Sequence, residues 1–163
     1  MTKEEFKVLF DSYFDSVRSY LFYRGAEKEQ ASDLAQDVFM RVWDKQLNVD
    51  PKTARRLLYK IAGDMFISRY RREMLEMNYR TTLKNDNVDF SPEDQLRYKQ
   101  LLENYTKALA GLNEKQRTVF LMSRMEGLKY YEIAERLDLS VKAVEKRMNI
   151  TLAYLKKTLQ ENV

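Results

Sequence analysis

The sequence predicts an all-α protein of two small helical domains joined by a polar linker. Apolar side chains recur at three- and four-residue steps through most of the 163 residues, which is the spacing of one face of a helix. The chain has four Gly and two Pro, too few for the many turns of a strand-rich fold. Between the two periodic halves lies the stretch LKNDNVDFSPED, which is rich in turn-forming and acidic residues.

The N-terminal domain is expected over residues 1–75, as a bundle of three or four helices. A first apolar stripe ends near Gly25, and a second ends before residues 48–51. These four residues combine turn formers with a proline that restricts its predecessor to extended geometry. A third helix follows, with apolar side chains from Leu57 to Phe66 on its buried side. The three stripes can together close one helical core.

The linker is expected over residues 76–94 and the C-terminal domain over residues 95–163. Helical periodicity resumes after the linker, and Gly111 and Gly127 mark the ends of two helices. The remainder of the domain is a pair of helices around the turn described next.

The stretch YYEIAERLDLSVKAVEKRMN, residues 130–149, predicts two helices that meet at a sharp turn. Asp138 is among the residues that tolerate a left-handed backbone at such a bend, and Ser140 can cap the second helix. The residues expected to face inward on the second helix are Val144, Met148, Leu152 and Leu155. Pattern and turn chemistry together predict a helix-turn-helix motif.

The outer side of the second helix carries cations near its N-terminal end, where a groove-reading helix contacts bases. Lys142, Ala143 and Lys146 suit base contacts, and the neighbouring cations suit phosphate contacts. The candidate residues for duplex DNA are Arg117, Lys129, Ser140, Lys142, Ala143, Lys146 and Arg147. Helix-turn-helix corners also occur in proteins that do not bind DNA, so the basic outer face is what favours DNA here.

Charge alternates along the chain beneath a net charge of +4. Residues 1–50 carry seven basic and ten acidic side chains, whereas residues 51–72 carry seven basic and one acidic. Residues 73–114 carry five basic and eight acidic, and residues 115–163 carry ten basic and six acidic. Two basic blocks separated by acidic surface indicate two contacts with a polyanion, although either block alone equally fits a solvated helix face.

The chain has no Cys and no His, which excludes disulfides, thiolate nucleophiles, imidazole bases and the usual zinc sites. The four Gly are scattered singly, so no phosphate-cradling loop is present. No apolar run reaches the length of a membrane span, and no signal core is seen. We therefore expect a cytoplasmic protein that is not an enzyme and has no cofactor.

Two stretches in this order resemble the bacterial sigma factors of the extracytoplasmic-function (ECF) group, in the sigma-70 family. ASDLAQDVFMRVWDK is similar to that family's second helix, and LNEKQRTVFLMSRMEGLKYYEIAERLDLSVKAVEKRMNITLAYLKK is similar to its closing helix-turn-helix domain. The resemblance covers about residues 5–72 and 95–158. It implies a promoter-specificity subunit that binds core RNA polymerase, contacts the −35 box as duplex and melts the −10 box.

The resemblance also implies roles for individual residues. The polymerase-binding face would be Asp33, Gln36, Asp37 and Arg41. The −10 set would be Asn48, Asp50, Lys52, Arg55, Arg56, Tyr59, Lys60, Asp64 and Arg71. In that set the loop 48–52 would form a pocket for a flipped base, and Tyr59 would stack on unpaired bases. Tyr59 also fits a position in the core, and without the resemblance the acidic face would be taken as an ordinary solvated helix face.

The third helix departs from the family's pattern at three positions. Gly63 stands where a basic residue is frequent, Asp64 where Asn is frequent, and Ser68 where Asp is frequent. Glycine weakens a helix interior by up to ~1 kcal/mol relative to alanine. The departures leave the preference for a −10 sequence open.

The expected partners are core RNA polymerase, promoter DNA and an anti-sigma factor, and the free chain is expected to be a monomer. The alternative is a stand-alone helix-turn-helix regulator, which would dimerise on a palindromic site. A third class is an enzyme or a scaffold. An enzyme would have to rely on carboxylates, Lys or Tyr for acid–base chemistry. A scaffold would not need exposed cations at the start of the second helix.

Overall fold

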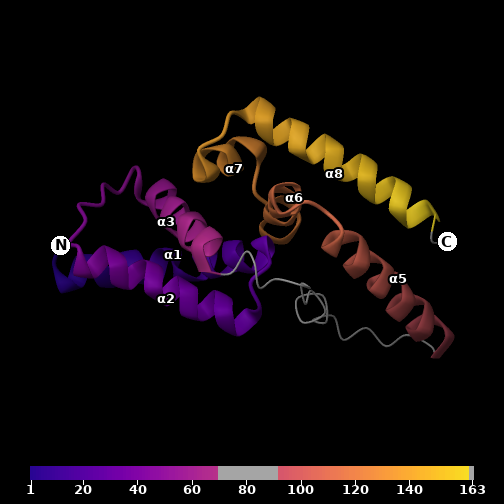
Figure 1. Ribbon diagram of the computed structural model, residues 1–163, viewed down its shortest axis with the longest axis horizontal. Helices are drawn as coiled ribbons and strands as arrows, with labels where there is room; N and C mark the ends of the chain where they lie inside the picture. Colours follow the sequence, from indigo (N-terminus) through magenta and orange to yellow (C-terminus); the bar gives the residue numbers. More distant parts are fainter. Residues whose placement is uncertain (70–91, 162–163) are drawn as a thin grey trace.

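The computed structural model describes residues 1–69 and 92–161, which form helices and no strand within those ranges (Figure 1). The predicted all-α class is confirmed. The helices are α1 (Lys3–Arg24), α2 (Lys28–Asp44), α3 (Ala54–Arg69), α5 (Pro92–Ala110), α6 (Glu114–Glu126), α7 (Tyr130–Leu137) and α8 (Val141–Glu161). α5 begins inside the stretch expected as linker.

Local chemistry fixes the ends of α1. Thr2 accepts from the backbone N–H of Glu5, and the Glu5 carboxylate accepts from the backbone N–H of Thr2, which forms a capping box. Gly25 ends the helix at φ 125°, a backbone conformation that other residues rarely adopt. The predicted end of the first helix is therefore confirmed.

The N-terminal helices α1, α2 and α3 pack around one core. Leu21, Leu34, Phe39, Leu58 and Phe66 are all fully buried there. These residues belong to the three apolar stripes that the periodicity predicted, and each helix carries one stripe.

The C-terminal core is built by α6, α7 and α8, with α5 packed against α8. Val144, Met148 and Leu155 face inward as expected, but Leu152 is exposed and Thr151 is buried in its place. Steps of four residues advance ~40° beyond a full turn, so the inward face passes from Met148 to Thr151. The hydroxyl of Thr151 donates to the carbonyl of Arg147 at 2.7 Å, which satisfies it in the core.

The two halves pack directly on each other. α6 lies against α1 and α7 lies against α3, so segments far apart in sequence are side by side (Figure 1). The buried apolar residues of both halves form one continuous cluster. The sequence predicted two domains, and this close packing between them was not foreseen.

None of the described helices is both long enough and apolar enough to span a bilayer.

Candidate nucleic-acid interface

The helix-turn-helix corner has the predicted turn chemistry. Asp138 adopts the left-handed conformation, with φ 54° and ψ 49°. The backbone N–H of Leu139 returns to the carbonyl of Ala134 at 2.9 Å, which closes the end of α7. Ser140 accepts from the backbone N–H of Ala143 at 3.1 Å and so caps α8.

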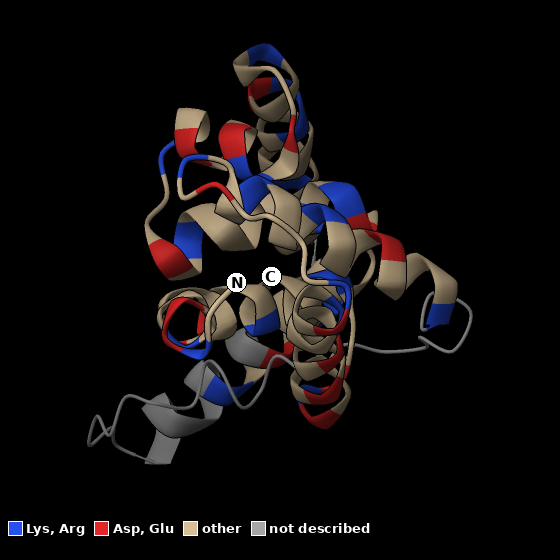
Figure 2. Cartoon of the chain, turned by 90° about the vertical axis from the view of Figure 1, so that its left-hand side faces the viewer, with Lys and Arg blue, Asp and Glu red and all other residues tan. Residues whose placement is uncertain are grey.

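The outer face of α8 presents cations at its N-terminal end. Lys142 and Lys146 are exposed, Ala143 is half-buried between them, and Val144 is buried beneath. Lys129, just before α7, is also exposed. Figure 2 shows Lys and Arg over both halves of the molecule, interspersed with Asp and Glu. The start of α8 is therefore accessible from solvent at these positions.

Arg117 is not free to hold a phosphate, and that prediction is wrong. Its side chain donates to the carbonyls of Tyr23 at 3.0 Å and Arg24 at 2.8 Å, and to Leu112 at 3.3 Å. The carbonyls of Tyr23 and Arg24 are at the C-terminal end of α1, where helix carbonyls lack partners and carry partial negative charge. Arg117 is therefore a buried clamp between the two halves.

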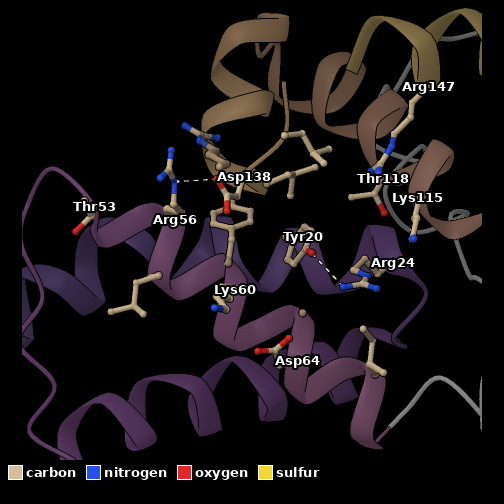
Figure 3. A pocket seen from close by; sticks show the side chains of 17 residues that line it. Tyr20, Arg24, Thr53, Arg56, Lys60, Asp64, Lys115, Thr118, Asp138 and Arg147 are labelled. Atoms are coloured by element: carbon tan, nitrogen blue, oxygen red, sulfur yellow. Dashed lines mark hydrogen bonds and ion pairs between the residues drawn. The ribbon is translucent and has the colours of Figure 1, made fainter. Parts of the chain in front are cut away.

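Arg147 faces the other half rather than the outer face of α8. It is half-buried and lines a cavity together with Tyr20 and Arg24 of α1 (Figure 3). Its predicted phosphate contact does not fit this arrangement.

Tyr59 is a core residue here, so its predicted stacking on unpaired bases does not fit the structure. Its ring lies 4.8 Å from that of Tyr20, and its hydroxyl donates to the carbonyl of Ser16 at 3.4 Å. Burial raises the pKa of Tyr59, because the phenolate would be desolvated. Of the two roles weighed for Tyr59, the structure fits the one in the core.

The rest of the −10 set on α3 lies beside the helix-turn-helix corner. Arg56 pairs with Asp138 at 3.7 Å across the two halves, and Lys60 and Asp64 line the same cavity (Figure 3). Arg55 is half-buried. The corner formed by α7 and α8 therefore lies against the −10 side of α3, while Arg56, Lys60 and Asp64 remain exposed to solvent. Arg71 lies outside the described residues.

The loop between α2 and α3 borders a second cavity of about 580 Å³. Asn48, Asp50 and Lys52 are exposed, and the Asp50 carboxylate accepts from the backbone N–H of Lys52 at 3.0 Å. Leu9 and Tyr13 of α1 form part of the opposite wall. The predicted loop thus borders a space of a size that small ligands occupy.

The polymerase-binding candidates share the outer side of α2. Asp33, Gln36 and Arg41 are exposed, whereas the stripe on the opposite side, which includes Leu34, is fully buried. Asp37 is half-buried and pairs with Arg69 at the end of α3. The face has the expected orientation, with one carboxylate already paired.

Sequence reasoning missed a cluster around Arg24. This arginine donates to the Tyr20 hydroxyl at 3.1 Å, pairs with Glu114 at 3.2 Å and lies 4.7 Å from the centre of the Phe66 ring. A Cβ at Gly63 would come within 2.9 Å of Nη1 of Arg24. The lone glycine inside α3 was the available signal, because such a glycine often marks a close approach.

Two family models match the chain, one in its N-terminal half and one in its C-terminal half. Residues 9–75 match the family model "Sigma-70 region 2", and residues 102–149 match "Sigma-70, region 4". The ferric citrate uptake sigma factor FecI of Escherichia coli K12 is 32% identical over 143 residues, which cover 86% of this chain and 83% of FecI. The RNA polymerase sigma factor YlaC of Bacillus subtilis is 27% identical, over 98% of this chain and 95% of YlaC.

Two solved structures share the fold. The sigma factor RpoE, in complex with the anti-sigma factor NepR from Bartonella quintana, has a TM-score of 0.61 at 20% identity, over 96% of this chain and 98% of RpoE. CnrH, in complex with the cytosolic domain of CnrY, has a TM-score of 0.65 at 23% identity, over 99% of this chain and 92% of CnrH. At such identities the likeness concerns the fold alone.

A stand-alone regulator is not favoured, because both sigma-70 regions are present in order. The chain belongs to the sigma-70 family and is an ECF sigma factor, a subunit that directs RNA polymerase to promoters.

Proposed function

We propose that this sigma factor acts through three surfaces and has no catalytic site of its own. Core polymerase would bind the outer side of α2, at Asp33, Gln36, Asp37 and Arg41. The −10 strand would contact Asn48, Asp50, Lys52, Arg55, Arg56, Lys60 and Asp64. The −35 duplex would contact Lys129, Ser140, Lys142, Ala143 and Lys146. Domains over 1–75 and 95–163 would carry the −10 and −35 contacts respectively.

One observation carries the −35 assignment. Lys142 and Lys146 are exposed one turn apart at the start of α8, directly after the corner made by Asp138 and Ser140. Neighbours four residues apart lie on one face of a helix, so both cations can approach the same groove. Ala143 beside them is small enough for close approach to a thymine methyl group.

The −10 assignment sets DNA in competition with a contact between the two halves. In the packed arrangement Arg56 is paired with Asp138, and Lys60 and Asp64 border a cavity that residues of the C-terminal half also line. Single-stranded DNA along α3 would compete with Asp138 for Arg56. Binding to polymerase would therefore select a conformation in which this contact is broken.

The cavity beside loop 48–52 supports a pocket for one flipped base. Extrusion of a base costs a few kcal/mol and has to be offset by stacking and edge contacts. Tyr13 of α1 and the side chain of Asn48 border that cavity and could supply a ring and an amide for such contacts.

The partners follow from the same role. RpoE and CnrH were each solved in complex with a second protein, and for RpoE that protein is an anti-sigma factor. We propose that an anti-sigma factor also holds this chain, and that the free chain is a monomer. Its place of action would be the cytoplasm, where polymerase and DNA are.

Transcription in vitro tests this function. The full chain is added to core polymerase and a DNA fragment from upstream of its own operon, and transcripts are mapped. We expect Lys142→Glu with Lys146→Glu to abolish specific initiation without preventing co-elution with core polymerase. The matched control is Lys156→Glu with Lys157→Glu, which makes the same charge change at exposed positions further along α8. Equal loss in both double variants, or no co-elution of the unaltered chain, would overturn the proposal.

A further inference from the structure

A cavity of about 620 Å³ lies between the two halves (Figure 3). α1 and α3 border it on one side, and α6, α7 and α8 border it on the other. Its charged lining has six cations and two carboxylates, Asp64 and Asp138. The cations are Arg24, Arg56, Lys60, Lys115, Arg136 and Arg147. The cavity therefore has an excess of positive charge.

Half of these cations already have acidic partners. Arg24 pairs with Glu114, Arg56 with Asp138 and Arg136 with Glu126. The side chains of Lys60, Lys115 and Arg147 form no hydrogen bond or ion pair with the described residues. Among the described residues, the positive charge of the cavity is thus only partly compensated.

The excess charge is concentrated at one end. Lys115 of α6 and Arg147 of α8 lie near Arg24 of α1, so three helices from both halves contribute to one place (Figure 3). Tyr20 accepts a hydrogen bond from Arg24, which leaves the hydroxyl proton of this buried tyrosine as a donor. Glu114 supplies one negative charge here, already engaged by Arg24.

The surroundings of Arg147 lower the pKa of its guanidinium. Burial is the main cause, Tyr20 opposes it, and the positive charge of Arg24 acts in the same direction as burial. A negative group between these two side chains would oppose both effects by attracting the guanidinium charge. The remaining lining, which includes Leu57, Ile67 and Leu139, is apolar and suits an organic moiety.

We propose that this cavity binds a small phosphate-bearing anion, with the phosphate at Arg24, Lys115 and Arg147. Phosphate is the anion class that this arrangement fits, because arginine and lysine from several directions can each donate to a different oxygen. A free oligophosphate and a nucleotide share this chemistry. The inference concerns the free chain and does not depend on the promoter contacts proposed above.

Such a ligand would hold the two halves together. The three cations come from both halves, so the site is complete only while they are packed. A ligand present at 100 times its dissociation constant would shift the ratio of packed to separated chains about 100-fold. Because the same packing places α7 against α3, the ligand would oppose the form of the chain in which the two halves are separated.

Calorimetric titration of the full chain tests the site, in the absence of polymerase and DNA. The probes are inorganic phosphate, tripolyphosphate, ATP and GTP. We expect at least one probe to bind with a dissociation constant below about 1 mM, and Lys115→Gln and Arg147→Gln each to weaken it about tenfold. The control is Lys156→Gln with Lys157→Gln, which should bind as the unaltered chain does. Tighter binding of a nucleotide than of tripolyphosphate identifies the nucleotide as the source, and equal binding identifies the oligophosphate.

Three results would overturn the proposal. One is no binding of any probe in that range, and another is equal weakening in the control, which would show a diffuse charge effect. The third is a poly-glutamate peptide that binds in an Arg147-dependent way when no phosphate probe does, which would assign the site to an acidic protein partner. Circular dichroism of each variant separates lost binding from lost folding.

A second measurement tests whether ligand binding is coupled to the packing of the two halves. The chain has no cysteine, so Glu29→Cys with Gln160→Cys provides one label on each half for energy transfer. The probe that binds should narrow the distribution of transfer efficiencies toward the packed form, and should fail to do so in Arg147→Gln. Binding without any such shift would refute the coupling.

Discussion

Arg24 at the end of α1 and Glu114 at the start of α6 form an ion pair of 3.2 Å that joins the two halves. Their side chains are only 9% and 15% exposed. The pair therefore belongs to the interior of the interface, where loss of one partner leaves a poorly solvated charge. Arg117, one turn further along α6, reinforces it with hydrogen bonds to the last carbonyls of α1.

The first prediction concerns this pair. Glu114→Gln should lower the free energy of unfolding by roughly 3 kcal/mol, because Arg24 would remain buried without its counter-charge. Urea denaturation measures the change. The control is Asp15→Asn, which removes an exposed pair with Arg18 of the same 3.2 Å length and should change stability by less than about 1 kcal/mol. Similar changes in the free energy of unfolding for the two substitutions would show that burial of the Arg24 pair does not increase its contribution to stability.

The second prediction concerns Gly63. Alanine should favour the helix by up to ~1 kcal/mol, yet Gly63→Ala should be destabilising, since its Cβ would lie 2.9 Å from Nη1 of Arg24 and 3.2 Å from the Tyr20 hydroxyl. Arg24 is held by several contacts and cannot move aside freely. In the background of Arg24→Ala, the same substitution should become neutral or stabilising. A double-mutant cycle measures this coupling, and strict additivity would contradict the role assigned to Gly63.

The departure at Gly63 thus has a physical reason that no local pattern could supply. Periodicity placed Leu34 in the core and the Asp33 side of α2 outside, because burial in a helix repeats every 3.6 residues. It could not place Arg117 or Arg24, since their partners are distant in sequence and depend on how the halves pack. The same limit applies to Tyr59, where one residue type suits both a core and a base-stacking surface.

The third prediction concerns DNA binding by α8. Lys146→Gln should weaken binding to duplex promoter DNA, because one cation beside the bases is lost, and should reduce the slope of log affinity against log salt by at most about 0.9, the value for one neutralised phosphate. Lys156→Gln, also exposed on α8, should leave the slope unchanged. Fluorescence anisotropy at several salt concentrations in the presence of core polymerase gives both slopes. Unchanged affinity of Lys146→Gln at every salt concentration would remove this residue from the interface.

The fourth prediction concerns the corner at Asp138. Its left-handed backbone, φ 54°, costs roughly 1 kcal/mol for most residues and almost nothing for glycine. The ion pair with Arg56 is exposed and contributes less than about 1 kcal/mol. Asp138→Gly should therefore raise or preserve the melting temperature, whereas Asp138→Ala should lower it. Equal lowering of the melting temperature in both variants would mean that the side chain of Asp138, which both variants lack, determines stability at the corner, and a higher melting temperature for Asp138→Ala than for Asp138→Gly would refute the backbone argument.

The last prediction concerns pH. Burial raises the pKa of Glu126, and the attraction of Arg136 at 4.0 Å only partly opposes this. The folded chain therefore holds this proton more tightly than the unfolded chain, so the Glu126 contribution to stability falls as pH rises from the unfolded pKa through the folded one. Oxygen Oε2 of Glu126 accepts no hydrogen bond in the described structure, which is consistent with a poorly solvated carboxylate. The difference in unfolding free energy between the unaltered chain and Glu126→Gln, measured from pH 4 to 8, isolates this contribution from that of the other carboxylates. The unaltered chain should lose stability relative to Glu126→Gln as pH rises, and a flat or rising difference would show that Arg136 compensates the buried charge in full.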